Sequence, residues 1–496
     1  MSLINVKNLT FAYEGSYDNI FENVSFQIDT DWKLGFTGRN GRGKTTFLNL
    51  LRGLYPYSGT ISAKVSFAYF PFDVPDTSVM TIEVVDDLLG SYEYWQLSRE
   101  LNALDVPDEV LYRPFDTLSK GEQTKVMLAA LFLRENSFLL IDEPTNHLDA
   151  AGRRLVSGYL RSKKGFILVS HDRAFLDGCI DHILSINKTD IQIQKGNFSS
   201  WQANKAMQDS FELAENEKLQ RQIKSMEAAA RRTARWSNDI EKRKSRNQNR
   251  DAGVKADKGH IGAQAAKMMK RSKAAEARKA SAIEKKSGLL KNIDRADTLK
   301  LHPLTYRSDI LISLEDLSLQ YGDADVPVFT GLTFDIRRGR RIALCGKNGC
   351  GKSSVLKLIC GEDIPYDGLF RRSAGLKISY VAQDTSDLAG TLDGYAASRG
   401  IEGTLLKTIL RKLDFDRVQF EKRIEDYSGG QKKKVLIAAS LCEEAHLYVW
   451  DEPLNYIDVL SRMQIEDLLL SYSPTMIFVE HDAAFCEKVA TDVVEL

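Results

Sequence analysis

The chain has 496 residues and a formal net charge of zero, with 43% hydrophobic and 27% charged residues. That length is too great for one domain and fits two domains with an insert. The longest apolar runs, such as Phe138–Ile141, have the length of strands, which excludes a membrane-spanning helix. No secretory signal is visible and the six cysteines form no CxxC pair, so we expect a cytoplasmic protein with reduced thiols.

The neutral average hides a strongly basic segment. Residues 221–280 contain 18 lysines and arginines against 6 acidic residues, a net charge of +12, so the rest of the chain carries −12. Such a segment favours a polyanionic partner. The alternative is a solvated charged helix, and charge alone does not decide between them.

The first half opens with two β-patterned runs, Leu3–Phe11 and Phe21–Ile28. An apolar strand follows at Leu34–Phe36 and runs into the glycine-rich segment Gly38–Thr45, which matches the phosphate-loop pattern G-x-x-x-x-G-K-S/T. We expect a helix to begin at Lys44. Strand, glycine-rich loop and helix in this order are the context that confirms a phosphate loop.

The second half repeats the first. Gly346–Ser353 is a second phosphate loop, and its lysine lies 308 positions after Lys44. A Ser lies 23 positions before an Asp-Glu pair in both halves, at Ser119 and at Ser428. Repetition of several motifs in one order predicts an α/β fold with two tandem P-loop nucleotide-binding domains.

The segment between the halves has no proline from residue 202 to residue 302. Apolar residues recur in it at helical spacing on either side of a turn-prone patch with Gly253 and Gly259. We therefore predict a hairpin of two long antiparallel helices with a basic tip near Arg243–Lys258. A purely structural connector would need neither that length nor that charge. The predicted domains are 1–201, 202–303 and 304–496.

Each phosphate loop predicts a set of nucleotide ligands. Backbone N–H groups of the loop surround the β-phosphate, and Lys44 or Lys352 neutralises the β/γ oxygens. The Thr45 and Ser353 hydroxyls are expected to ligate Mg²⁺. The predicted ATP-binding residues of the two loops are Gly38, Asn40, Gly41, Gly43, Lys44, Thr45 and Thr46, and Gly346, Asn348, Gly349, Gly351, Lys352, Ser353 and Ser354.

Two carboxylates follow an apolar strand in each half. Asp142 is expected to hold Mg²⁺, and Glu143 is expected to act as the general base for the attacking water. Asp451 and Glu452 repeat this pair in the second half. Taken alone, Asp-Glu after an apolar run is usually only a strand end, and its distance behind a phosphate loop favours catalysis.

Leu118–Glu122 and Tyr427–Gln431 resemble the LSGGQ signature of ABC ATPases. The resemblance implies that the signature of one half completes the ATP site of the other when the halves close together. N–H groups at the start of the following helix then face the γ-phosphate. The residues implied in this contact are Ser119, Gly121, Glu122, Ser428, Gly429, Gly430 and Gln431.

The same resemblance implies further site residues. His171 and His481 occupy the place of the histidine that contacts the γ-phosphate, and Tyr13 and Tyr321 the place of the aromatic ring that stacks on adenine. An isolated aromatic residue is more often part of a core. Gln383 fits the glutamine that contacts Mg²⁺.

The two halves depart from the family pattern at different places. Phe72 stands where Gln383 stands in the second half, and Lys120 replaces a signature glycine. Leu454 and Tyr456 replace the Thr and His of the first half. A phenyl ring cannot ligate Mg²⁺, so we expect two unequal ATP sites.

The tandem cassettes, the linker and the run Glu143–Asp149 resemble the ABC-F class. Members of that class act on ribosomes, where the linker enters the tRNA exit region and points at the peptidyl-transferase centre. Several stretches resemble the Lsa-type antibiotic-resistance proteins, which dislodge lincosamides, streptogramin A and pleuromutilins. These stretches are Asp31–Gly35, Gly38–Lys44, Phe211–Lys218, Met269–Lys273 and Trp450–Tyr456.

The resemblance implies an ATPase that uses ATP and Mg²⁺ and binds the 70S ribosome, through 23S rRNA and tRNA near the exit site. We expect a monomer whose cassettes close on each other. Alternatives are a housekeeping translation factor of the same class and the ATPase component of a transporter. The linker residues expected nearest RNA are Arg243, Lys244, Arg246 and Arg250, with Trp236 as a stacking partner.

Overall fold

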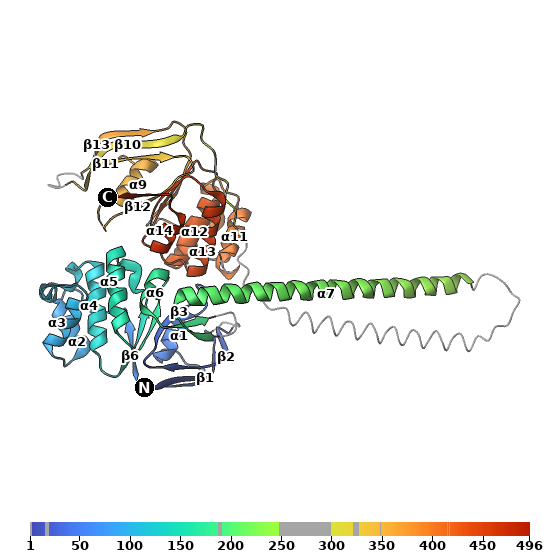
Figure 1. Ribbon diagram of the computed structural model, residues 1–496, viewed down its shortest axis with the longest axis horizontal. Coiled ribbons are helices and arrows are strands. Elements are labelled where there is room, and N and C mark those ends of the chain that lie inside the picture. The colour runs from blue at the N-terminus through green and yellow to red at the C-terminus, as the bar shows by residue number, and fades with distance from the viewer. Residues whose placement is uncertain are drawn as a thin grey trace. The chain divides into compact units, whose positions relative to one another are not determined.

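The computed structural model describes residues 2–14, 19–186, 191–247, 299–320, 327–347, 349–413, 415 and 417–496 (Figure 1). The chain divides into two compact units. One unit contains residues 1–201 together with 296–496, and the other contains residues 202–295. The two halves of the first unit are the two predicted nucleotide-binding domains, called here the first and second cassettes.

A six-stranded sheet forms the centre of the first cassette, in the order β5-β6-β7-β3-β8-β9. Its strands are parallel except for β9, which pairs antiparallel with β8. The middle strands are buried on both faces, as their continuous apolar runs predict. The bounds are β3 (Lys33–Thr37), β5 (Ser66–Phe70), β6 (Ser137–Asp142), β7 (Phe166–Val169), β8 (His182–Ile186) and β9 (Ile191–Lys195).

A smaller antiparallel sheet lies in the same cassette, in the order β2-β1-β4. Its strands are β1 (Leu3–Phe11), β2 (Phe21–Asp29) and β4 (Ser58–Ser62), so the first two predicted runs are confirmed to within one residue. Helix α1 (Lys44–Leu51) begins at the lysine of the phosphate loop, as predicted. Phe36 and Phe47 of β3 and α1 are fully buried in the core that this sheet shares with the central sheet.

The other helices of the first cassette build a second core around α4 and α5. The signature segment stands at the start of α4, and the Asp-Glu pair at the end of β6. The bounds are α2 (Thr81–Leu89), α3 (Tyr94–Ala103), η1 (Asp108–Tyr112), η2 (Phe115–Thr117), α4 (Lys120–Leu133), η3 (Pro144–His147), α5 (Ala150–Ser162) and α6 (Arg173–Cys179).

The second cassette repeats this plan with a five-stranded parallel sheet, β14-β15-β16-β12-β17, and an antiparallel sheet, β11-β10-β13. The strands are β10 (Ile310–Leu319), β11 (Phe329–Arg337), β12 (Arg341–Cys345), β13 (Tyr366–Arg372), β14 (Ile378–Val381), β15 (Leu447–Asp451), β16 (Met476–Val479) and β17 (Asp492–Glu495). The helices are α9 (Lys352–Cys360), α10 (Leu392–Ser398), α11 (Gly403–Lys412), η4 (Arg417–Glu421), η5 (Ile424–Asp426), α12 (Gly429–Cys442), α13 (Val459–Tyr472) and α14 (Ala483–Val489).

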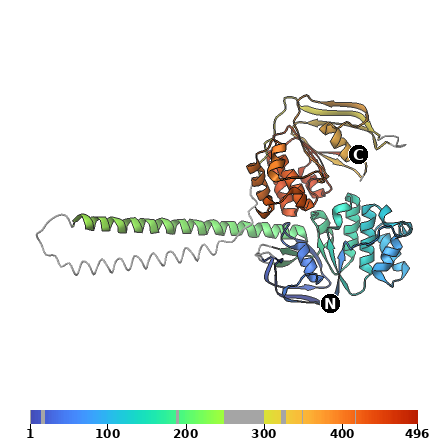
Figure 2. The ribbon, with the colours of Figure 1, turned by 180° about the vertical axis from the view of Figure 1, so that it is seen from behind.

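Helix α7 (Phe198–Asn247) runs without a break for 50 residues, a length of roughly 75 Å (Figures 1 and 2). Its first turn belongs to the first cassette, where Phe198 and Trp201 are buried in the core. The predicted first linker helix is therefore present. Trp236, Arg243, Lys244 and Arg246 lie on it, whereas Arg250 and the predicted second helix lie outside the described residues.

None of the described helices combines the length and the apolar character that crossing a bilayer requires.

Candidate active site

The first phosphate loop curls around the ammonium group of its own lysine. Lys44 is almost fully buried, and its Nζ donates to Gly38 O at 2.7 Å and to Asn40 Oδ1 at 3.2 Å. Gly43 has a φ of 90°, and a Cβ there would lie 2.5 Å from a side-chain carbon of Ile20. The turn therefore requires glycine. Burial lowers the pKa of Lys44, and nearby carboxylates oppose that shift.

The second phosphate loop has the same construction. Lys352 is buried, and its Nζ donates to Gly346 O at 3.0 Å and to Lys347 O at 2.8 Å. Gly351 has a φ of 95°, and a Cβ there would meet Val328 at 2.7 Å.

Oxygen ligands for a divalent cation gather beside each loop. In the first cassette, Thr45 Oγ1 and Tyr69 OH each donate to Asp142 Oδ2 at 3.1 Å. In the second, Asp451 has a buried Oδ1 without a hydrogen-bond partner among the described residues. Burial raises the pKa of Asp451, and a hydrogen bond from the Ser353 hydroxyl opposes the shift. Hydroxyl and carboxylate oxygens are the ligands that Mg²⁺ prefers, so the donor set fits this ion.

The two glutamates that follow these aspartates share an unusual backbone. Glu143 has a φ of 51° and Glu452 a φ of 45°, in the left-handed region that non-glycine residues rarely adopt. Such strain persists where the surrounding fold imposes it, and it concentrates at functional sites. Each glutamate faces the histidine of its own cassette. His171 Nε2 lies 3.1 Å from Glu143 Oε1, and His481 Nε2 lies 3.3 Å from Glu452 Oε1.

The two glutamates have pKa shifts of opposite direction. Burial, together with the charge of Asp142, raises the pKa of Glu143 to about 8. Burial also acts on Glu452, but hydrogen bonds from His481 and Gln383 outweigh it and lower the pKa of that carboxyl. Burial thus favours the protonated form of Glu143, whereas its hydrogen bonds favour the ionised form of Glu452.

The histidine beside Glu143 is shifted toward its neutral form. Burial and the charge of Lys44 lower the pKa of His171 well below its usual value. The 3.1 Å approach of His171 to Glu143 does not complete a hydrogen bond at Glu143 Oε1, which has no such partner among the described residues.

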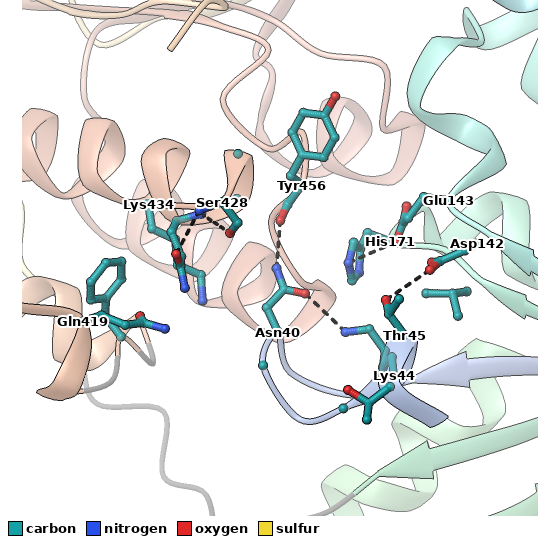
Figure 3. A pocket seen from close by; sticks show the side chains of 18 of the residues that line it. Asn40, Lys44, Thr45, Asp142, Glu143, His171, Gln419, Ser428, Lys434 and Tyr456 are labelled. Carbon is teal, nitrogen blue, oxygen red and sulfur yellow. Dashed lines mark hydrogen bonds and ion pairs between the residues drawn. The ribbon is translucent and has the colours of Figure 1, made fainter. Parts of the chain in front are cut away.

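A cavity of about 520 Å³ brings together the phosphate loop of the first cassette and the signature of the second (Figure 3). Asn40 connects the two sides, because its Nδ2 donates to Tyr456 O at 2.8 Å while its Oδ1 accepts from Lys44. The signature residues of this cavity are Ser428, Gly429, Gly430 and Gln431, and the residues of the first cassette include Tyr13, Asn40, Gly41, Gly43, Lys44, Thr45, Thr46, Asp142, Glu143 and His171.

A second cavity, also of about 520 Å³, has the reciprocal composition. Lys120 of the first signature reaches this cavity. The other residues from the first cassette are Asn146, His147 and Leu148, and those from the second include Gly349, Gly351, Lys352, Ser353, Ser354, Gln383, Glu452 and His481. Each site is thus built from both cassettes.

The two signatures are held by the same helix cap. Ser119 N donates to Glu122 Oε2 at 2.8 Å, and Ser428 N donates to Gln431 Oε1 at 3.0 Å. The serine Oγ in turn accepts from the backbone N–H of Glu122 or Gln431. The side chains of Glu122 and Gln431 are therefore engaged in capping, while each serine hydroxyl keeps its proton for a ligand.

The family of the chain follows from comparison with known proteins. Two segments, residues 21–146 and 329–455, match the family model described as ABC transporter. The chain belongs to the ABC transporter family. Its two copies are the two cassettes, and the predictions of a tandem ABC fold and of an ATPase are confirmed.

Known relatives align with nearly the whole length of this ABC protein. "Ribosome protection protein VmlR" of Bacillus subtilis is 28% identical over 96% of this chain and 84% of its own length. "ABC transporter F family member 2" of Arabidopsis thaliana is 24% identical over 99% of this chain and 76% of its own length. These relatives agree with the predicted ABC-F class.

Solved structures share the fold. A complex of the archaeal ribosomal stalk protein aP1 with the ribosome recycling factor aABCE1 contains a chain of TM-score 0.62 and 20% identity, covering 98% of this chain and 87% of that one. The structure titled "RNase-L Inhibitor" has a TM-score of 0.61, also at 20% identity, over 99% of this chain and 87% of that one.

Two predicted site residues of this ABC protein lie outside the described part of the chain, and the site also contains residues that were not predicted. Tyr13 lines the first cavity, with its hydroxyl 2.8 Å from Thr46 Oγ1, whereas Tyr321 and Asn348 lie outside the described residues. Phe72 packs against the helical core of its cassette. Tyr69, which donates to Asp142, was not predicted. Phe415, Gln419 and Lys434 of the second cassette, which line the first cavity, were not predicted either. No sequence motif marks these residues, and only the folded structure brings them to the site.

Proposed function

We propose that this ABC-F ATPase binds ribosomes and protects them from antibiotics of the peptidyl-transferase centre, in the manner of the Lsa-type proteins. The observation that carries the proposal is α7, a continuous 50-residue helix that leads from the first cassette into a segment of net charge +12. A positive helix of this length suits a polyanionic partner such as rRNA. A relative named as a ribosome protection protein supports the proposal.

The proposed partners are the 70S ribosome, with 23S rRNA and tRNA near the exit site as the contacts of the linker. Such a protein works in the cytoplasm as a monomer, and its domains are 1–201, 202–303 and 304–496. The proposed drug classes are lincosamides, streptogramin A and pleuromutilins, as the Lsa-type stretches suggest.

In the proposed chemistry, ATP binds with its phosphates against Lys44 or Lys352 and meets the signature serine of the opposite cassette. Mg²⁺, held by Thr45 and Asp142 or by Ser353, Gln383 and Asp451, would neutralise phosphate charge. Glu143 and Glu452 would accept the proton of the attacking water, with His171 and His481 toward the γ-phosphate.

A drug-susceptibility test on a strain that expresses the chain distinguishes this function from its alternatives. We expect raised inhibitory concentrations for the three drug classes, and no effect from the matched variant with Glu143→Gln and Glu452→Gln at equal expression. Unchanged susceptibility together with altered elongation in a purified translation system would instead identify a housekeeping factor. A transporter ATPase is disfavoured because its cassettes have no use for a long basic linker.

A further inference from the structure

A buried ion pair connects the two cassettes. Arg173, the first residue of α6, binds both carboxylate oxygens of Glu466 in α13, with Nη1 donating to Oε2 at 3.2 Å and Nη2 donating to Oε1. The Nη2 atom also lies 3.7 Å from Asp482 Oδ2. The side chain of Glu466 is fully buried, and Arg173 is 8% exposed. A two-pronged pair of this kind fixes the orientation of both groups as well as their distance.

Each cassette has an equivalent Arg–Asp ion pair close to this position, but the Arg173–Glu466 pair is not repeated. Arg153 binds Asp172 at 3.0 Å in the first cassette, and Arg462 binds Asp482 at 3.2 Å in the second, at equivalent positions after the caps of α5 and α13. Ala483, which follows Asp482, occupies the position equivalent to Arg173.

The partner position has also changed. Ser157 stands in α5 where Glu466 stands in α13, counted from the helix caps Asp149 and Asp458. Its hydroxyl donates to Phe175 O within its own cassette at 3.2 Å. Alanine and serine carry no charge, so the reciprocal ion pair is impossible.

Arg173 and Glu466 belong to the two sides of the Lys44 site. Arg173 follows His171 by two residues in the first cassette. The helix of Glu466 follows its cap Asp458, which pairs with Lys434 of the signature helix α12 at 3.2 Å. Lys434 and the start of α12 line the same cavity as His171. The ion pair therefore ties the histidine side of this site to its signature side.

We propose that Arg173 is a positioning residue that, through Glu466, holds the Lys44 site closed around its nucleotide. The Lys352 site has Ala483 at the equivalent place and opens first. Separation of the cassettes would take Arg173 away from Glu466 and leave that carboxylate with Lys488, which lies 3.1 Å away in the same cassette. Breaking a buried, two-point ion pair is costly, and Ala483 and Ser157 form no equivalent pair. The inference goes beyond the proposed ribosomal function, because it concerns the order in which the two ATP sites open.

Nucleotide release from the purified full chain tests this order. A fluorescent, non-hydrolysable ATP analogue is loaded with Mg²⁺ and chased with unlabelled nucleotide in a stopped-flow instrument. We expect two release phases, of which Lys44→Ala removes the slower. Arg173→Ala, which installs the residue of the second cassette, should accelerate the slow phase about tenfold and leave the fast phase unchanged.

Matched variants distinguish a positioning role of Arg173 from a general destabilisation of the fold. Glu466→Ser, the residue of the first cassette, should act like Arg173→Ala, and the double variant should release no faster than either single one. The double variant removes both charges of the pair, while Lys488 keeps Asp467 and Asp482 keeps Arg462 as partners, so it keeps the test valid if a single variant unfolds early. Arg399→Ala breaks a pair with Glu443 inside the second cassette and should change neither phase.

Three results would overturn the proposal. In the first, Arg173→Ala accelerates both release phases equally. In the second, the double variant accelerates release by the product of the two single effects, and in the third, Arg173→Ala leaves the rate of the slow phase unchanged. No ribosome is present in this assay, so its outcome is independent of whether the ribosomal proposal holds.

Discussion

Gln383 donates a hydrogen bond of 2.9 Å from its Nε2 to Oε2 of Glu452, whereas Phe72, two residues beyond the equivalent strand of the first cassette, has no group to donate. Asn455 adds a second hydrogen bond to the same oxygen at 2.7 Å. These donors stabilise the ionised carboxylate of Glu452. The substitution that first suggested a lost Mg²⁺ contact thus has a second consequence, because it removes a donor that lowers the pKa of one of the two proposed general bases.

The two sites should differ in pH dependence. A general base acts only when deprotonated, so hydrolysis at the Lys44 site should rise with pH until the pH exceeds about 8, the pKa of Glu143. The lowered pKa of Glu452 should leave the Lys352 site active throughout the neutral range. Steady-state ATPase profiles of Glu452→Gln, for the Lys44 site, and Glu143→Gln, for the Lys352 site, measure each separately. Two superimposable profiles would refute this assignment.

Replacing Gln383 with Phe should make the second site resemble the first. Loss of one hydrogen bond to a charged group should lower turnover about tenfold near pH 7 and move the acidic limb of the profile to higher pH. The measurement is best made in the Glu143→Gln background. Gln383→Asn is the control, because it keeps an amide, and a shift equal to that of the Phe variant would contradict the role of the donor.

Lys120 should favour ATP over ADP at the Lys352 site. It lines that cavity at a signature position where the second cassette has Gly429. Burial, together with the charge of Lys120, lowers the pKa of His147. A cation facing the γ-phosphate should make Lys120→Met lose about fivefold in affinity for an ATP analogue but not for ADP. Equilibrium titration of both nucleotides tests this. Lys120→Arg, which keeps the charge, should retain the preference.

Removal of both proposed general bases should trap the closed state. We expect the variant with Glu143→Gln and Glu452→Gln to bind ATP, to hydrolyse it at least a hundredfold more slowly, and to sediment with ribosomes in the presence of ATP. Centrifugation through a sucrose cushion with and without ATP is the measurement. Undiminished turnover would remove both glutamates from the proposed role.

The linker charges should matter for ribosomes and not for ATP. Replacing Arg243, Lys244 and Arg246 with Ala should reduce the salt dependence of ribosome binding by a log–log slope of about three, because three cations release fewer counterions. Ribosome-free ATPase activity should stay near that of the unchanged protein. If the triple variant protects cells equally well at equal expression, this part of the linker is not the working end.

Local sequence determined a large part of the fold. The strand Leu3–Phe11, the strand at Leu34–Phe36 and the helix that begins at Lys44 were predictable, because alternation, apolar runs and glycine-rich turns act over a few neighbouring residues. The repeat predicted two cassettes with catalytic motifs at matching places. A long helix at the start of the linker was predicted from the absence of proline and the helical spacing of apolar residues, and α7 is that helix.

Relations between the cassettes were decided by tertiary structure alone. The sequence contains Ser428 and Lys44 but no local signal that they share a cavity, and the family resemblance was needed to expect it. The pKa of Glu143 depends on burial and on Asp142, and the pairing of Arg173 with Glu466 joins residues 293 positions apart. Burial, charge proximity and hydrogen-bond geometry are properties of packed surfaces, and packing depends on the whole chain rather than on a short segment.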